Sequence, residues 1–344
     1  MNRYRLTAVF SAFTALLSLL FLCNLCFGTV RIPLEEVLSI LTGGASDKES
    51  WYVIVRQSRL PSAVTALLAG SSLACSGLLL QTVFRNPLAG PDILGVNGGA
   101  GLGVACVMLV LGGNITAGAM TLGNTLSIMA GAFAGALAVS GLILILSAKL
   151  RNPAMLLIAG IMVSYLASSA ISLLNFFSTA EGVQSYMMWG MGSFNNVTTE
   201  RLPLFCMVIA AGLVISLALV KKLNVMLLGD YYAENLGVNI NRTRTLLLLS
   251  TCMMVAADTA MCGPVSFIGL AVPHIARLIL KDNNHRILMP VTILTGAAIA
   301  LLCNLLCTLP GDNGLIPLNA VTPVIGAPVV LYVLLCEYRS MNRG

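Results

Sequence analysis

One acidic residue lies well inside an apolar stretch of the sequence. Asp258 is the only charged residue between Thr245 and Ala276. If this stretch crosses a membrane, the carboxylate costs roughly 2.5–3.5 kcal/mol on insertion scales, so it should face the interior of a helix bundle or water. Asp258 is therefore either a substrate- or proton-handling group in a pathway, or a polar side chain bonded to a neighbouring helix. The residue pattern favours neither interpretation.

Residue spacing disfavours two other kinds of chemistry. A P-loop requires Gly-Lys followed by Ser or Thr, and Gly precedes none of the lysines. Any ATP-driven work therefore needs a separate ATPase chain. The ten cysteines sit within or at the ends of apolar runs rather than in a polar loop, so we interpret them as small buried hydrophobes and predict no metal site.

The composition is that of an integral membrane protein. Only 9% of the 344 residues are charged, against about 25% in soluble domains. Hydrophobic residues make up 58% of the chain, and the mean hydropathy is +0.92. A water-exposed surface needs more polar residues than this. The net charge of +6 is scattered along the chain, which disfavours a nucleic-acid binder.

The intervals between charges predict an all-α polytopic fold. About 20 apolar residues are needed to cross the hydrocarbon core. The long interval after Ile93 has room for two crossings with a turn near Gly112, and a break at Gly263-Pro264 divides another. We expect a single permease-like domain, 1–344, with ten spans. These are about 6–28, 60–84, 93–111, 117–148, 153–177, 202–220, 245–262, 264–279, 287–309 and 314–336.

The distribution of basic residues sets the orientation. With ten spans and a cytoplasmic start, most Lys and Arg residues fall inside, as the positive-inside rule requires. Both termini are then predicted to be cytoplasmic. The basic residues left outside are Arg31, Lys48, Arg56, Arg59 and Arg201.

Glycine and proline indicate close packing and broken helices. Gly95, Gly99 and Gly103 recur every four residues, as do Gly131 and Gly135, a spacing that lets helices approach closely in lipid. Several prolines interrupt the predicted spans after residue 264. Interrupted helices are tolerated where protein or a water-filled cavity satisfies the freed backbone groups, so they favour a transport pathway.

Two kinds of loop could bind partners. In the cytoplasmic segment 228–240, Asp230 is expected to cap a short helix that Gly237 ends. This helix is either a contact for a soluble partner or an ordinary connector. The outer loops, 29–59 and 178–201, carry Arg56, Arg59 and Arg201, which suggests an acidic docking partner.

The motifs together resemble one transporter family. The stretches RLPSAVTALLAGSSLACSGLLLQTVFRNPLAGPDILGVNGGAGLG, LGDYYAENLGVN, GPVSFIGLAVPHIARLI and GLIPLNAVTPVIGAPVVLYVLL resemble, in the expected order, spans and the coupling segment of FecCD-type permeases. These are the permease subunits of type II ABC importers for iron–siderophores, haem and vitamin B12. The resemblance implies a vitamin B12 permease-like fold of ten spans in the bacterial inner membrane.

The resemblance also implies partners and roles. Two permease copies would form a homodimer with two ATPase subunits, which bind the ATP and magnesium, so no cofactor is expected in this chain. A periplasmic or lipid-anchored binding protein would deliver the substrate, docking at Arg59. The ATPase would contact Asp230, Tyr231, Glu234, Leu236 and Gly237, and the inner gate would comprise Arg151, Asn152, Pro153 and Ala154.

The chain departs from the family pattern at three places. Ser62 stands where relatives often carry a second Arg, and the stretch from Cys303 to Thr308 lacks basic residues, so docking could rest on Arg56 or Arg201. Asp258 falls where a small or hydroxyl residue is expected. We expect a permease importing a metal chelate of undetermined identity. The alternatives are a proton-coupled secondary transporter that uses Asp258 and a non-transporting receptor.

Overall fold

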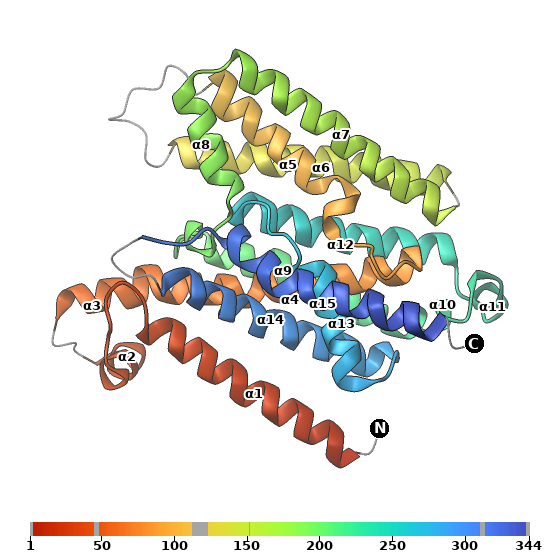
Figure 1. Ribbon diagram of the computed structural model, residues 1–344, viewed down its shortest axis with the longest axis horizontal. Coiled ribbons are helices and arrows are strands. Elements are labelled where there is room, and N and C mark those ends of the chain that lie inside the picture. The colour runs from red at the N-terminus through yellow and green to blue at the C-terminus, as the bar shows by residue number, and fades with distance from the viewer. Residues whose placement is uncertain (1–2, 45–47, 112–122, 151, 310–313, 342–344) are drawn as a thin grey trace.

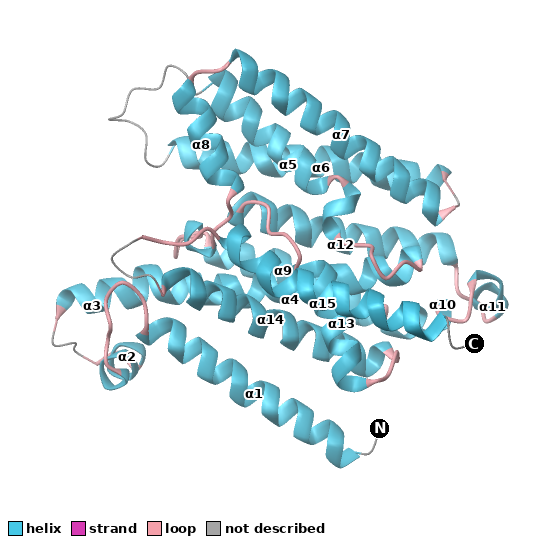
Figure 2. Cartoon of the chain, viewed as in Figure 1, coloured by secondary structure: helices cyan, strands magenta, loops and turns pink. Residues whose placement is uncertain are grey.

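The computed structural model describes residues 3–44, 48–111, 123–150, 152–309 and 314–341, and these residues are helical apart from short links (Figure 2). The turn predicted near Gly112 lies outside them. The α-helices are α1 (Arg3–Cys26), α2 (Leu34–Leu41), α3 (Glu49–Val53), α4 (Leu60–Phe84), α5 (Val96–Ala105), α6 (Gly123–Lys149), α7 (Pro153–Phe177), α8 (Ala180–Gly190), α9 (Leu202–Ala218), α10 (Val220–Met226), α11 (Asp230–Asn235), α12 (Ile240–Cys262), α13 (Ile268–Leu280), α14 (His285–Thr308) and α15 (Leu318–Met341). Shorter 3₁₀ or π-helical segments are η1 (Ile54–Arg59), η2 (Pro91–Leu94), η3 (Cys106–Leu111) and η5 (Phe194–Asn196).

The all-α polytopic prediction is confirmed. Six of the described helices are long and apolar enough to cross a membrane, and α9 with α10 forms a seventh span bent by 51°. Three shorter apolar helices, α5 with η3, α13 and the first part of α15, fall within the remaining predicted spans. The break predicted at Gly263-Pro264 separates α12 from α13.

Two segments predicted as outer loops contain helices instead. The segment 29–59 holds α2, α3 and η1, and the segment 178–201 holds α8 and η5. The amphipathic pattern of α2, LEEVLSIL, places Val37 and Ile40 against the protein, and it is too short to be detected by counting spans. The length of an interval without charged residues identifies membrane-spanning helices, but it does not reveal helices of two or three turns.

The packing centres on α4 and α12. Figure 1 shows α1, α4, α13 and α14 on one side of α12 and α5, α6, α7 and α8 on the other. α4 is buried along nearly its whole length and contacts α9, α12, α13 and α14. One apolar cluster surrounds α4, and a second joins α5, α6 and α12. Charge-free α4 is therefore a central element, not a lipid-facing one.

Glycines allow the closest approaches between spans. A Cβ atom at Gly135 of α6 would lie 2.1 Å from the Gly99 carbonyl oxygen of α5, and one at Gly103 would lie 1.9 Å from that of Gly131. Since real side chains do not come this close, only glycine fits at these crossings. The predicted packing role of both glycine series is confirmed.

Different helices lie at the two ends of the bundle. Figure 1 shows the start of α1, the end of α15, α10 and α11 at one end, and α2 and α3 at the other. We name these the inner end and the outer end, after the predicted topology.

Candidate functional site

The inner end presents α11 as a short exposed helix between two spans. Gly229, with a φ of +107°, precedes it, and Gly237, with a φ of +80°, follows it. The Gly237 amide donates to the Glu234 carbonyl at 2.9 Å and the Val238 amide to that of Ala233 at 3.0 Å, which closes the helix as a glycine C-terminal motif does. Gly237 therefore ends the helix as predicted.

The exposed surface of α11 is aromatic and apolar. Tyr231 is 75% exposed, while Tyr232 and Leu236 are each 64% exposed. Glu234 is exposed beside them, and Ala233 is buried on the underside. Large exposed apolar groups next to a carboxylate, beyond the ends of the spans, suit contact with a protein rather than with water.

Asp230 does not cap α11, which corrects the prediction from the sequence. The cap position is Gly229, and among the described residues there is no side-chain hydrogen bond that caps this helix start. The Asp230 carboxylate instead accepts from Arg85 Nη2 at 2.6 Å and lies 3.7 Å from Arg244 Nη2. Arg85 directly follows α4, and Arg244 belongs to α12 with a side chain only 4% exposed. Asp230 thus ties α11 to two spans.

The predicted inner gate lies at the start of α7. The Asn152 side chain accepts from the Ala154 amide at 2.9 Å, and Pro153 occupies the first helical position, so this is a capped helix start. Figure 1 shows this start at the same end as α11. Arg151 lies outside the described residues. The gating role stays a prediction.

At the outer end, the three predicted docking arginines have different environments. Arg59 is 8% exposed and donates through Nη1 to the Leu25 carbonyl at 2.7 Å and through Nη2 to the Val30 carbonyl. It therefore tethers the end of α1, and its docking role stays a prediction. Arg56 is exposed, with its guanidinium 5.8 Å from the Tyr52 ring centroid. Arg201 Nη1 donates to Met129 Sδ at 2.8 Å.

Asp258 lies between α4 and α12. Ser72 Oγ donates to Asp258 Oδ2 at 2.7 Å, and the residue is 1% exposed. Its Oδ1 has no partner within the part of the chain that the structure describes. Asp258 is absent from the residues that line the described cavities. This placement favours the helix-bonding interpretation over the pathway interpretation, and the two had been left open.

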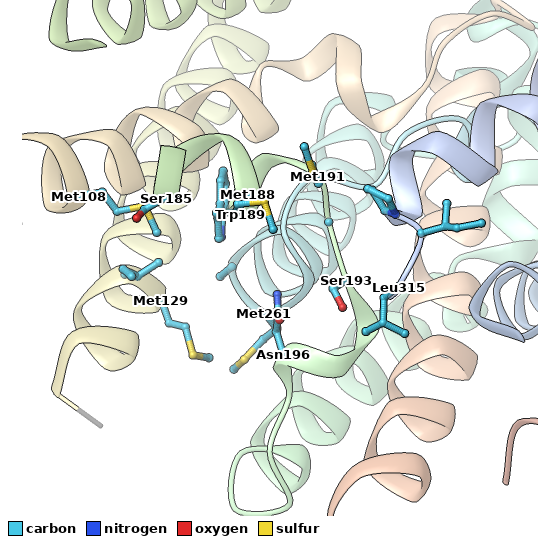
Figure 3. A pocket seen from close by; sticks show the side chains of 15 residues that line it. Met108, Met129, Ser185, Met188, Trp189, Met191, Ser193, Asn196, Met261 and Leu315 are labelled. Atoms are coloured by element: carbon cyan, nitrogen blue, oxygen red, sulfur yellow. The ribbon is translucent and has the colours of Figure 1, made fainter. Parts of the chain in front are cut away.

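The largest described cavity lies at the outer end. Its volume is about 450 Å³, it is open on one side, and its lining comes from η3, α6, α8, η5, the end of α12 and the segment before α15. Figure 3 shows Met129 and Met261 pointing toward each other in the cavity, with Met188 and Trp189 on α8 above them. We call it the methionine pocket. Its remaining lining residues are Met108, Ile128, Ser185, Met191, Gly192, Ser193, Asn196, Ala260, Leu315, Ile316 and Pro317.

The side chain of Asn319 holds one wall of the methionine pocket together through hydrogen bonds to backbone groups. The Asn319 amide group donates through Nδ2 to the carbonyls of Gly190 at 3.0 Å and Pro264 at 2.7 Å. Its Oδ1 accepts from the Ser266 amide at 3.1 Å. Gly192 has a φ of +70°, and a Cβ there would lie 2.9 Å from the Pro264 carbonyl oxygen. The end of α8, the α12–α13 link and the start of α15 therefore meet at Asn319.

Sequence reasoning missed both the methionine pocket and Asn319. The pocket's methionines come from separate segments with no common spacing, and Trp189 suits an interfacial belt equally well. Burial raises the pKa of Tyr186, which packs with a centroid separation of 6.1 Å against Trp189, so the phenol stays neutral. The breaks around Pro264 and Pro317 were the available signal, since they point to a cavity.

Fold and site together define a multi-span membrane permease: a helix bundle with broken spans, a cavity at one end and an exposed helix at the other. The chain belongs to the FecCD transport family, whose model matches residues 16–336. It is 33% identical over 338 residues to the vitamin B12 import system permease protein BtuC of Klebsiella pneumoniae, covering 96% of this chain and 93% of that protein. It is 35% identical over 287 residues to the protein of the same name from Salmonella typhi, covering 83% and 85%.

Solved structures show the same architecture. One, described as an inward-facing conformation of a putative metal-chelate type ABC transporter, matches with a TM-score of 0.82 and 29% identity, covering 96% of this chain and 99% of that one. PsaBC from Streptococcus pneumoniae matches with a TM-score of 0.52 and 14% identity, covering 87% and 95%, which shows a likeness of fold alone. The family predicted from the motifs is therefore confirmed.

Proposed function

We propose that the chain is the membrane subunit of an ATP-driven importer of a metal chelate. Two copies would pair around a pathway in the bacterial inner membrane, with both termini cytoplasmic. Separate ATPase subunits would bind ATP and magnesium, and a periplasmic or lipid-anchored binding protein would supply the chelate. The names of the relatives support the substrate class: a vitamin B12 import permease and a metal-chelate type transporter.

The observation that carries this proposal is the shape of α11. A helix of six residues is too short to be stable alone. Here it is closed by glycine at both ends, held by Asp230, and exposes two tyrosines and a leucine. Such a rigid apolar projection suits a cleft in an ATPase, whose movement would tilt α4 and α12 and shift the bundle between two states.

Leu236→Asp tests the contact with the ATPase. Because the side chain is 64% exposed, the substitution leaves the fold intact and places a charge in the interface. We expect loss of ATPase co-purification and of ATP-dependent uptake in reconstituted complexes. Leu309→Asp is the matched control, since Leu309 is 60% exposed at the outer end and its variant should retain the ATPase. Full retention by Leu236→Asp would contradict the assignment.

The same complexes separate this function from proton-coupled transport through Asp258. With Asp258 bonded to Ser72 and away from the described cavities, Asp258→Asn should keep most ATP-dependent uptake. Uptake that needs a proton gradient but no ATPase, and that disappears in Asp258→Asn, would support the secondary transporter instead.

A further inference from the structure

The short helix α2 carries an apolar face that the protein covers only in part. Val37 and Ile40 are buried against the bundle, whereas Leu34, Leu38 and Leu41 are 47%, 46% and 41% exposed. At about 100° per residue, the three exposed leucines fall within about 60° of one another, beside the buried pair. The apolar face of α2 is therefore wider than its contact with the protein.

The opposite side of α2 is polar. It carries Glu35, Glu36 and Ser39. A helix with one apolar and one polar face suits the boundary between hydrocarbon and water, where each face meets its own medium. The eight residues of α2 include no Lys or Arg that could attract anionic headgroups. Apolar burial, rather than charge, would therefore hold the helix at such a boundary.

The chain places α2 level with the outer end of the α1 span. The apolar part of α1, Leu6–Cys26, has 21 residues. At 1.5 Å per residue this is about 31 Å, which matches a hydrocarbon core of about 30 Å. The Ile32 amide then donates to the Cys26 carbonyl at 3.0 Å, so the chain turns back at once. Because α2 begins directly after this turn, it lies where hydrocarbon gives way to headgroups.

The orientation of α2 and its neighbours fit this level. Figure 1 shows α2 nearly end-on while α1 and α14 run across the view, so α2 lies across the direction of the spans. The α3–η1 segment follows, and η1 contacts α2. In this segment Lys48 Nζ lies 4.7 Å from the Trp51 ring centroid, and the Arg56 guanidinium lies 5.8 Å from that of Tyr52. Aromatic residues gather at the headgroup level of a membrane.

The exposed leucines also continue an apolar surface of α1. This span packs against α14 on one side, and Leu16, Leu19 and Phe27 are exposed. The Phe27 amide donates to the Cys23 carbonyl at 2.8 Å, so the helical path extends to Phe27, which lies about three turns beyond Leu16 on the same side. Exposed Val30 leads from there to α2. An apolar surface that runs from a span onto a crosswise helix matches acyl chains.

We propose that α2 is an interfacial helix whose leucines, Leu34, Leu38 and Leu41, insert among the acyl chains at the edge of the outer leaflet. Glu35 and Glu36 then face water. The insertion anchors the link between α1 and α4 to the membrane, and Arg59 tethers the same link to the protein through the carbonyls of Leu25 and Val30. Anchoring of this kind requires neither an ATPase nor transport.

A tryptophan on each face of α2 tests the insertion. The chain has two tryptophans, so the Trp51→Phe, Trp189→Phe background has no indole of its own. Leu41→Trp then reports the apolar face, and Glu35→Trp reports the polar face, about 120° away. The full chain is placed in nanodiscs whose lipids are brominated near either the carboxyl end or the methyl end of the acyl chains.

We expect bromine near the carboxyl end to quench Leu41→Trp about twofold or more, and bromine near the methyl end to quench it less, because an interfacial helix enters only the top of the acyl region. Iodide in the water should quench Glu35→Trp more than either lipid does. Leu34→Trp repeats the measurement on the apolar face from the other end of α2. Absence of lipid quenching in both leucine variants, or equal lipid quenching of Glu35→Trp, would overturn the insertion.

Leu38→Glu separates lipid from other occupants of the same face. In the Leu41→Trp background it should lower the lipid quenching about twofold or more, because a carboxylate resists leaving water. Glu35→Gln is the matched control and should keep the quenching. The association of the binding protein and the oligomeric state, measured by size-exclusion chromatography with light scattering, should stay unchanged. Loss of binding-protein association or a change of oligomeric state in Leu38→Glu, with lipid quenching unaffected, would assign the face to a protein partner and overturn the proposal.

Discussion

The carboxylate of Asp230 lies 2.6 Å from the guanidinium of Arg85, which joins the first residue of α11 to the inner end of α4. Arg244 of α12 approaches the other carboxylate oxygen at 3.7 Å. α4 is the most enclosed span of the bundle, since it contacts α9, α12, α13 and α14. A displacement of α11 would therefore reach α4 through the ion pair of Asp230 with Arg85.

The first prediction concerns this ion pair. Arg85 and Asp230 are 52% and 41% exposed, and pairs of this kind contribute only about 0–1 kcal/mol to stability. Arg85→Gln, which leaves Asp230 beside Arg244, should therefore leave thermal stability nearly unchanged. If the chain is the importer subunit proposed above, the variant should lower the number of substrate molecules transported per ATP hydrolysed several-fold, because the displacement of α11 is no longer passed to α4. Transport and hydrolysis measured on the same proteoliposomes give this ratio.

A double-mutant cycle identifies the partner. If the pair transmits the displacement, Arg85→Gln, Asp230→Asn and the double variant should lower the ratio equally, because each removes the same link. Arg242→Gln is the control, since Arg242 is an exposed arginine on α12 outside the pair. Effects that simply add would show that the two residues act independently.

The second prediction separates two arginines near the outer end. Arg59→Gln should lower stability by about 1–3 kcal/mol, because the carbonyls of Leu25 and Val30 lose a charged donor in a buried place. Arg56→Gln should leave stability unchanged and slow association of the binding protein, with a weaker dependence on salt, since exposed charges steer encounter. Thermal unfolding in detergent and surface-based binding kinetics measure the two effects. Equal stability losses would contradict this division.

The family, the all-helical fold and the glycine crossings could be predicted from the sequence because each depends on local chemistry. The length of an interval without charged residues indicates a membrane-spanning helix, whichever helices pack around it. A glycine every four residues reports close approach, as the contact of Gly135 with Gly99 shows. Gly237 ends α11 because its positive φ is a conformation that glycine adopts readily, whatever its distant neighbours are.

The roles of charged residues could not be predicted in this way. Asp230 has the sequence context of a helix cap, but its partners, Arg85 and Arg244, follow α4 and lie in α12. Arg59 has the sequence context of an exposed docking residue and is buried by the end of α1. Partners this distant in sequence are known only once the helices are packed. The methionine pocket, assembled from separate segments, is hidden for the same reason.

The third prediction tests the crossing of α5 and α6. Gly135→Ala should lower thermal stability by about 1–3 kcal/mol, because the added Cβ would lie 2.1 Å from a carbonyl oxygen and the helices must separate. Gly141→Ala on the same helix meets nothing within 4 Å and should be neutral or slightly stabilising, since alanine favours helix. A similar loss in both variants would mean that the crossing does not limit stability.

The fourth prediction concerns Asn319, where three outer segments meet. Its amide makes hydrogen bonds to Gly190, Pro264 and Ser266, each with a net contribution of about 0.5–1.5 kcal/mol. Asn319→Leu removes all three, so the wall of the methionine pocket should open more often, by about tenfold or more. Cys262 reports this opening, because it is fully buried and its carbonyl accepts from the Ser193 amide at 2.8 Å.

Thiol labelling resolved by mass spectrometry measures the change. In Asn319→Leu the labelling rate of Cys262 should rise, while Cys252, buried farther along α12, should keep its rate. Asn319→Gln retains an amide and should give a smaller increase. A parallel rise at Cys252 would indicate general loosening of the bundle. An unchanged rate at Cys262 would show that Asn319 does not hold the outer end closed, because the wall would then stay shut without these three bonds.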